Sequence, residues 1–164
     1  MIRKQMKKFQ YENSIGYVVY SASKAYQKAF DLELRDKIGI TVTQSKVIFA
    51  LYLFSGLTQR ELADKIGVET PSLVPIIDKM EEDGYVKRKL DPKDRRIKRI
   101  YTTNKADALW DSMLECASHI RKVSLKEVSE QEVNSALETI KKITENLSTY
   151  IVDFEVVPAK KAKN

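Results

Sequence analysis

The stretch QRELADKIGVETPSLVPIID, residues 59–78, decides the fold because it has the pattern of two short helices joined by a tight turn. Gly67 stands where that turn needs a left-handed backbone, and Ala63 supplies the small side chain that lets the two helices cross closely. Apolar residues occupy the positions where the helices would touch: Leu62, Ile66, Val68, Leu73 and Ile76. The stretch predicts a helix-turn-helix, and the alternative interpretation is a helical pair that serves only as scaffold.

Helix boundaries elsewhere are marked by capping residues and glycines. Three stretches have the form of a capping box, in which a hydroxyl side chain and the glutamate or glutamine three residues later each bond the other's backbone N–H: Thr41-x-x-Gln44, Thr58-x-x-Glu61 and Ser129-x-x-Glu132. Segments of 3.6-residue apolar periodicity end at four glycines: Gly39, Gly56, Gly67 and Gly84. For the helix before Gly84 we expect Thr70 as the N-cap and Pro71 at the first helical position.

A basic strip follows the helix-turn-helix. Residues 85–100 hold eight bases and two acids, and the bases alternate with β-forming residues around Asp91-Pro92. Two such runs around an Asp-Pro turn predict a β-hairpin. Outside this strip and the basic tails at residues 1–11 and 156–164, the chain holds 14 bases against 21 acids. The hairpin is therefore expected to be a concentrated positive surface on an acidic body, whereas the tails can equally be ordinary solvated surface.

The composition excludes several classes of protein. The 164 residues have a mean hydropathy of −0.40 and no apolar run near the ~20 residues that a membrane span needs. No apolar segment of a secretory signal follows the basic N-terminus, so we expect a cytoplasmic protein with no membrane partner. A single Cys and a single His exclude an internal disulfide and a structural zinc site. Cys116 and His119 share a predicted helix face without a nucleophile-elbow sequence nearby, so we expect no enzyme and no cofactor.

The hairpin sequence RKLDPKDRR, residues 88–96, carries a family resemblance. Together with the helix-turn-helix, over Leu57 to Thr103, it resembles the MarR family of bacterial winged-helix transcription regulators. The resemblance implies a mainly α fold with a small β-hairpin wing: a winged helix-turn-helix at about residues 41–103, flanked by long dimerisation helices at about 13–38 and 104–156. Since the chain holds no repeat or low-complexity linker, we expect a single MarR-like domain over residues 1–164.

At the wing tip, the resemblance implies that Arg96 reaches into the minor groove of DNA while Asp94 orients it. The chemistry supports this independently, because a guanidinium suits the negative potential of a narrow minor groove and a carboxylate can fix its rotamer. We expect Arg88 to form a second ion pair with Asp91 or Asp94.

In a winged helix, the second helix of the motif enters the major groove, and the hairpin reaches the flanking backbone or minor groove. The residues predicted to contact DNA lie at the starts of the two helices, along the second helix and on the hairpin: Gln59, Arg60, Thr70, Pro71, Ser72, Val74, Lys79, Arg88, Lys93, Asp94, Arg95, Arg96 and Lys98. Pro75 departs from the family, since its ring offers no donor to a base edge and removes a backbone hydrogen bond. Few groups are therefore left for direct base readout.

These features predict a sequence-specific regulator that binds double-stranded DNA, a repressor released by a small-molecule effector. Long apolar stripes on the terminal helices predict a homodimer that binds a pseudo-palindromic operator, although the last helix could instead fold back on the first. A small aromatic or anionic effector would find four aromatic candidates, whose alternative role is core packing: Tyr17, Tyr20, Phe49 and Tyr52. The competing function is a protein-interaction module whose wing, with Arg95, Arg96 and Lys98, meets an acidic protein.

Overall fold

A computed structural model describes residues 11–156; the basic side chains predicted in the two tails lie outside these residues, at Arg3, Lys4, Lys7, Lys8, Lys160, Lys161 and Lys163. The chain divides into two compact units, Met1–Arg121 and Lys122–Asn164. The first unit holds a 3-10 helix η1 (Tyr11–Asn13) and then α1 (Ile15–Ile38), α2 (Val42–Leu53), β1 (Leu57–Thr58), α3 (Gln59–Ile66), α4 (Thr70–Glu82), β2 (Val86–Leu90), β3 (Lys98–Thr102), α5 (Asn104–Asp107) and most of α6 (Trp110–Ser124). The second unit contains α7 (Glu130–Val156).

The predicted helix-turn-helix is confirmed in α3 and α4. Gly67 has a φ of 72°, which gives the left-handed turn between the two helices. Ala63 at the crossing is fully buried. The capping box of Thr58 and Glu61 at the start of α3 is present in both directions. The inward faces of the two helices bury Leu62, Ala63, Leu73, Ile77 and Met80.

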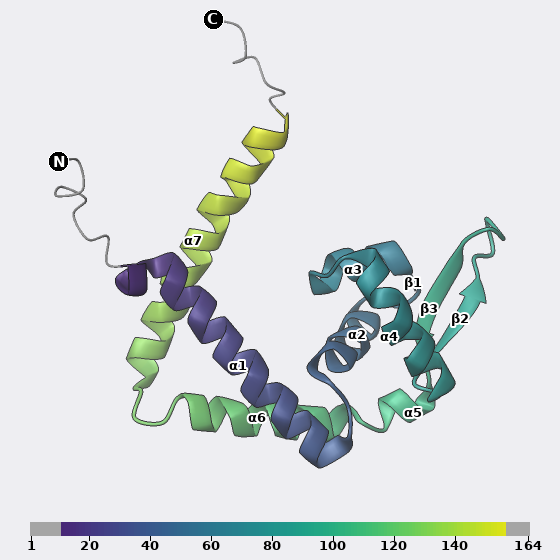
Figure 1. The fold of residues 1–164 in the computed structure, drawn as a ribbon, viewed down its shortest axis with the longest axis horizontal. Coiled ribbons are helices and arrows are strands. Elements are labelled where there is room, and N and C mark those ends of the chain that lie inside the picture. Colours follow the sequence, from purple (N-terminus) through teal and green to yellow (C-terminus); the bar gives the residue numbers. More distant parts are fainter. Residues whose placement is uncertain (1–10, 157–164) are drawn as a thin grey trace, which may run out of the picture. The chain divides into compact units, whose positions relative to one another are not determined.

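The sheet has three antiparallel strands in the order β1-β3-β2 (Figure 1). The predicted hairpin is formed by β2 and β3. The additional strand, β1, has only two residues, too few to leave a periodic pattern in the sequence, and it pairs Thr58 with Arg99. On its other side Arg99 pairs with Lys89 of β2. The central strand β3 therefore links the wing directly to the residue that caps α3.

Three predicted helix boundaries are wrong by a few residues. The N-cap of α4 is Glu69, so Thr70 and Pro71 both lie in the first turn, where backbone N–H groups lack helical partners in any case. The helix expected to end at Gly56, α2, already ends at Leu53 because the backbone of Phe54 has left the helical region. The helix expected from residue 104 is split between α5 and α6, where the Leu109 N–H bonds the Ala106 carbonyl at 3.0 Å in a tighter turn.

The main element of the second unit, among the described residues, is the long amphipathic helix α7. At its start, the Ser129 N–H donates to the Glu132 carboxylate at 2.9 Å and the Glu132 N–H donates to the Ser129 hydroxyl at 3.3 Å, which confirms the third capping box. Apolar side chains spaced by three and four residues stay exposed along α7: Leu137, Ile140, Leu147, Tyr150, Ile151 and Phe154. Among the described residues, no helix is long and apolar enough to cross a membrane.

A carboxylate on α1 caps the helix that follows it. The Val42 N–H, at the first position of α2, donates to Asp31 Oδ1 at 2.7 Å, and Arg35 donates to Asp31 Oδ2 at 2.6 Å. We expect Asp31→Ala to lower the free energy of unfolding by about 1–3 kcal/mol, because the Val42 N–H loses its acceptor. Urea unfolding checks this. As a control, Asp36→Ala removes an exposed carboxylate 3.7 Å from Lys37 and should change stability by less than about 0.5 kcal/mol.

The pH dependence of this cap follows from the pKa of Asp31. Partial burial acts to raise this pKa, but the bonds from Val42 and Arg35 bring it below the ordinary value of 3.8. A carboxyl whose pKa is lowered by folding stabilises the folded state above its unfolded pKa. The stability difference between the wild type and Asp31→Ala should therefore be full at neutral pH and shrink as the pH falls below 3.8. An equal difference at pH 7 and pH 2 would contradict the capping role.

Candidate nucleic-acid interface

The outward face of α4 is mainly apolar and short-chained. Pro71, Ser72 and Val74 are exposed there, while Leu73 and Ile77 face the core. Pro75 lies inside the helix and is also exposed. Toward the end of the helix, Lys79 forms ion pairs with Asp83 at 3.0 Å and Glu82 at 3.8 Å. This face can contact thymine methyl groups and offer a hydroxyl, but it carries little positive charge.

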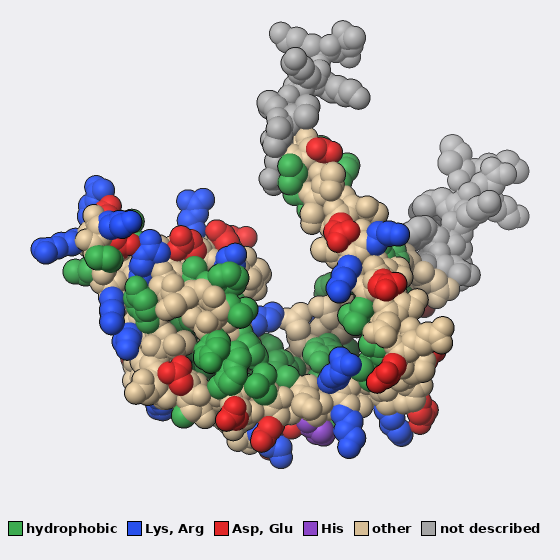
Figure 2. All heavy atoms as spheres, turned by 180° about the vertical axis from the view of Figure 1, so that it is seen from behind, with side chains coloured by type: hydrophobic (Ala, Val, Ile, Leu, Met, Phe, Trp, Pro, Cys, Tyr) green, Lys and Arg blue, Asp and Glu red, His purple; other side chains and the backbone are tan. Residues whose placement is uncertain are grey.

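Positive charge is concentrated on the projecting wing. Lys93, Arg95, Arg96 and Lys98 are all exposed on or beside the turn between β2 and β3. Figure 2 shows Lys and Arg side chains gathered on this projecting hairpin. The wing can therefore supply the sequence-independent attraction to phosphates that dominates protein affinity for duplex DNA.

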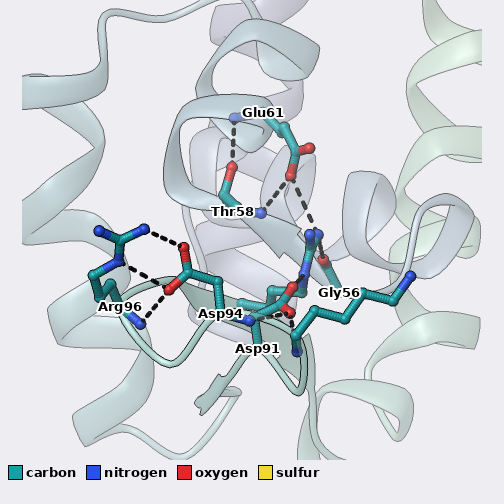
Figure 3. A network of polar contacts seen from close by, with 8 residues as sticks. Gly56, Thr58, Glu61, Asp91, Asp94 and Arg96 are labelled. Carbon is teal, nitrogen blue, oxygen red and sulfur yellow. Dashed lines mark hydrogen bonds and ion pairs between the residues drawn. The ribbon is translucent and has the colours of Figure 1, made fainter.

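At the wing tip, the Asp94 carboxylate binds the Arg96 side chain. Arg96 donates from Nε to Asp94 Oδ1 at 3.1 Å and from Nη2 to Oδ2 at 3.0 Å, and its backbone N–H also bonds Oδ1 at 3.0 Å (Figure 3). The bonds from the side chain and the backbone of Arg96 lower the pKa of Asp94, so the carboxylate stays charged. The Arg96 side chain is nevertheless 90% exposed, which presents the guanidinium, paired with Asp94, to solvent.

Two adjoining clefts lie where the wing meets the helix-turn-helix. One, of about 550 Å³, is lined by residues of α3, α4 and both wing strands: Gln59, Asp78, Glu81, Arg88, Lys89, Leu90 and Lys98. The other, of about 450 Å³, is lined by Thr58, Gln59, Arg88, Arg96, Ile97, Lys98 and Ile100. Gln59, at the start of α3, Arg88, on β2, and Lys98, on β3, line both clefts, so the same hollow is lined by three predicted DNA contacts.

Arg88 has different partners from those that the sequence predicts. The expected pair with Asp91 or Asp94 is wrong: Arg88 binds Glu81 at 2.5 Å and Asp78 at 2.6 Å, both on α4. Its backbone N–H also donates to Glu81 at 2.8 Å. The reason is the direction of the Arg88 side chain, which packs against α4 and is only 18% exposed. Arg88 therefore joins the wing to the second helix of the motif and neutralises acids on it.

Comparison with known proteins identifies the family. A model described as MarR family matches residues 38–97. The solved structure of transcriptional regulator PA3341 is 31% identical, with a TM-score of 0.72 over 83% of this chain and 99% of that one. The chain belongs to the MarR family. A MarR transcriptional regulator from Methanosarcina mazei Go1 is 24% identical with a TM-score of 0.73, covering 83% of this chain and 97% of that one. CouR from Rhodococcus jostii RHA1, solved bound to p-coumaroyl-CoA, is 26% identical with a TM-score of 0.67, covering 80% and 92%.

The MarR family consists of transcription regulators, which bind DNA and act as dimers. Its winged helix accounts for the arrangement of α3, α4 and the β2-β3 hairpin described above. The individual DNA contacts predicted from the sequence stay predictions. In the structure these residues lie on α3 and α4 of the helix-turn-helix and on the hairpin that follows it.

The four aromatic residues predicted as effector contacts lie on two helices of the MarR fold. Phe49 and Tyr52 of α2 both contact Trp110, with ring centroids 5.0 Å and 4.0 Å away. Tyr17 and Tyr20 lie in the first two turns of α1. Tyr52 stays 55% exposed although its ring stacks on Trp110.

The lone cysteine lies apart from the wing. Cys116 lines a cleft of about 320 Å³ between α1 and α6, where His119 Nδ1 is 2.9 Å from the Glu33 carboxylate. The thiol is buried, and burial, aided by Glu33 and Glu115, raises its pKa. The thiolate that oxidants attack is therefore disfavoured at this position.

Sequence reasoning missed two residues of the wing, Asp91 and Arg99. Arg99 donates from Nε to Asp91 Oδ2 and from Nη1 to the Gly56 carbonyl at 2.7 Å. Asp91 counted in the sequence only as a turn former and as a possible partner of Arg88. The pair joins residues eight positions apart across a hairpin, so only the strand register would have revealed it.

Proposed function

We propose that this protein is a sequence-specific regulator that binds double-stranded DNA through α4 in the major groove and the wing in the minor groove. The observation that carries the proposal is the exposed guanidinium of Arg96, which donates two hydrogen bonds to the Asp94 carboxylate. An ordered arginine at the end of a projecting hairpin matches the narrow, negative minor groove. Backbone contacts would come from the clefts beside Gln59 and Lys98.

The proposal includes a two-fold homodimer. Both α1 and α7 carry exposed apolar side chains, such as Ile15 and Val18 on the first and Leu147 and Ile151 on the second. Exposed stripes of this kind mark interfaces. Two winged helices related by a two-fold axis would contact half-sites about one DNA turn, ~34 Å, apart, so the operator would be pseudo-palindromic. Such a protein would act in the cytoplasm, as a repressor.

Release by a small molecule is the second part of the proposal. CouR was solved with p-coumaroyl-CoA. We propose that a small aromatic or anionic effector binds beside Phe49 and Tyr52, with Tyr17 and Tyr20 as further candidates. The partly exposed ring of Tyr52, stacked on Trp110, supports this place because an aromatic ligand can extend the stack.

Fluorescence anisotropy on a duplex from the region upstream of the protein's own gene tests the proposal. The expected result is a steep linear fall of log affinity with log salt, together with at least ~10³-fold weaker binding to a scrambled duplex. Equal binding to both duplexes would contradict sequence specificity at this operator. No binding to either duplex at low salt would favour the competing function, a module whose basic wing meets an acidic protein.

A further inference from the structure

Arg99 occupies a place between the wing and the helix-turn-helix. It lies on the central strand β3, paired with Thr58 on one side and Lys89 on the other. Toward α3, its Nη1 donates to the Gly56 carbonyl at 2.7 Å and lies 3.6 Å from the Glu61 carboxylate. Glu61 is already bound to the Thr58 N–H at 2.7 Å. Arg99 therefore contacts the segment that leads into α3 through a hydrogen bond to Gly56 and the first turn of α3 through an ion pair with Glu61.

Toward the wing, Arg99 binds the carboxylate on which the turn is built. Asp91 Oδ2 accepts from Arg99 Nε, while Asp91 Oδ1 accepts from the N–H groups of Lys93 at 2.7 Å and Asp94 at 3.2 Å. Asp91 is only 6% exposed. A carboxylate so shielded requires a charged partner, and the bond from Arg99 is the main reason that its pKa lies below the usual range. Removing Arg99 would leave this carboxylate uncompensated.

A continuous chain of bonds then leads from Arg99 to Arg96. Asp91 holds the Asp94 N–H, and the Asp94 carboxylate holds Arg96 (Figure 3). The Ile97 carbonyl accepts from the Asp91 N–H at 2.9 Å, which closes the turn. We propose that Arg99 is a positioning residue of the DNA interface, which ties the wing turn to the start of α3 and so fixes where Arg96 is presented. This inference rests on the proposed DNA-binding function.

Arg99 differs in this role from its neighbour Lys98, although both carry one positive charge. Lys98 is exposed and lines the clefts, whereas the Arg99 side chain is 31% exposed and its guanidinium is bound to protein acceptors. A residue that contacts phosphate contributes to the salt dependence of binding. A positioning residue contributes instead by ordering the wing before DNA arrives, which lowers the entropy cost of binding.

The test compares Arg99→Ala with Lys98→Ala as the charge-matched neighbour. We expect Arg99→Ala to weaken duplex binding by about 2- to 13-fold, the cost of immobilising one flexible side chain, without changing the salt slope. In the DNA-free protein it should accelerate hydrogen exchange at the Lys93 and Asp94 amides. Lys98→Ala should reduce the salt slope by about one and leave that exchange unchanged.

Two further variants separate positioning from general stability. In an Arg96→Ala background, adding Arg99→Ala should cost little more affinity, because the group being positioned is gone. Arg99→Lys keeps the charge but cannot reach Asp91 and Gly56 together, so it should restore only part of the affinity. If Arg99→Ala does not fold, Asp91→Asn takes its place and should give the same pattern.

Each contrary result has a distinct meaning. A salt slope lowered by about one in Arg99→Ala would make Arg99 a DNA contact and overturn the inference. Fully additive losses with Arg96→Ala, or unchanged amide exchange, would overturn it too. Failure of the wild type to bind any duplex would instead overturn the proposed function, and the exchange measurement would still decide whether Arg99 anchors the turn.

Discussion

Arg96→Ala is expected to weaken binding to duplex DNA by about 5- to 150-fold and to lower the slope of log affinity against log salt by about one. The side chain is 90% exposed, so its removal leaves no cavity. Its two bonds reach only Asp94, within the wing turn, and the backbone N–H bond from residue 96 to Asp94 remains in the variant, so the fold should survive. The lost affinity would therefore come from the missing contact with DNA, and anisotropy across a salt series measures both quantities.

A charge-matched control decides whether this loss is specific to the wing tip. Lys37 lies in the last turn of α1, away from the wing, and its side chain is 59% exposed. Lys37→Ala also removes one positive charge but should leave affinity and slope nearly unchanged, because no phosphate contact is lost. Equal losses in the two variants would mean that only net charge matters. Unchanged binding in Arg96→Ala would remove the wing from the proposed interface.

Local sequence patterns predicted the features whose partners lie within a few residues. The capping box of Thr58 and Glu61 spans three positions; the Asp94–Arg96 pair, which spans two, was implied by the family resemblance and fits the chemistry of a guanidinium beside a carboxylate. Such contacts depend on backbone conformations that the residues themselves favour, so a pattern in the sequence is enough to reveal them. Gly67 was predictable for the same reason, because its φ of 72° is a local requirement of the turn.

Contacts that depend on how elements pack could not be predicted in this way. Arg88 has several acids within reach along the sequence, and only the packing of β2 against α4 selects Asp78 and Glu81. Likewise, the pairing of Arg99 with Gly56 joins residues 43 positions apart. The charge of the wing was therefore foreseeable, but its division between outward and anchoring arginines required the three-dimensional structure.

The core of the helix-turn-helix should be sensitive to truncation. Leu62→Ala is expected to lower the free energy of unfolding by about 2–5 kcal/mol, since it removes buried methyl groups and leaves a cavity. Leu62 is fully buried in the cluster that also holds Ala63, Leu73 and Ile77. Urea unfolding at one fixed protein concentration measures the change, because the proposed homodimer would make stability depend on concentration.

Leu62→Met provides the matched control for this core position, since methionine keeps the volume and the apolar character of leucine. Its cost should be less than about 1.5 kcal/mol.

Because α3 carries Gln59 and holds Arg99 through Glu61, loosening this helix should also disturb the wing, so Leu62→Ala should weaken DNA binding even where most of the protein is folded. A loss below about 1 kcal/mol in Leu62→Ala would mean that α3 is not packed against the core as described. A large loss in stability with wild-type DNA affinity in the folded protein would instead mean that the wing does not depend on α3 for its position.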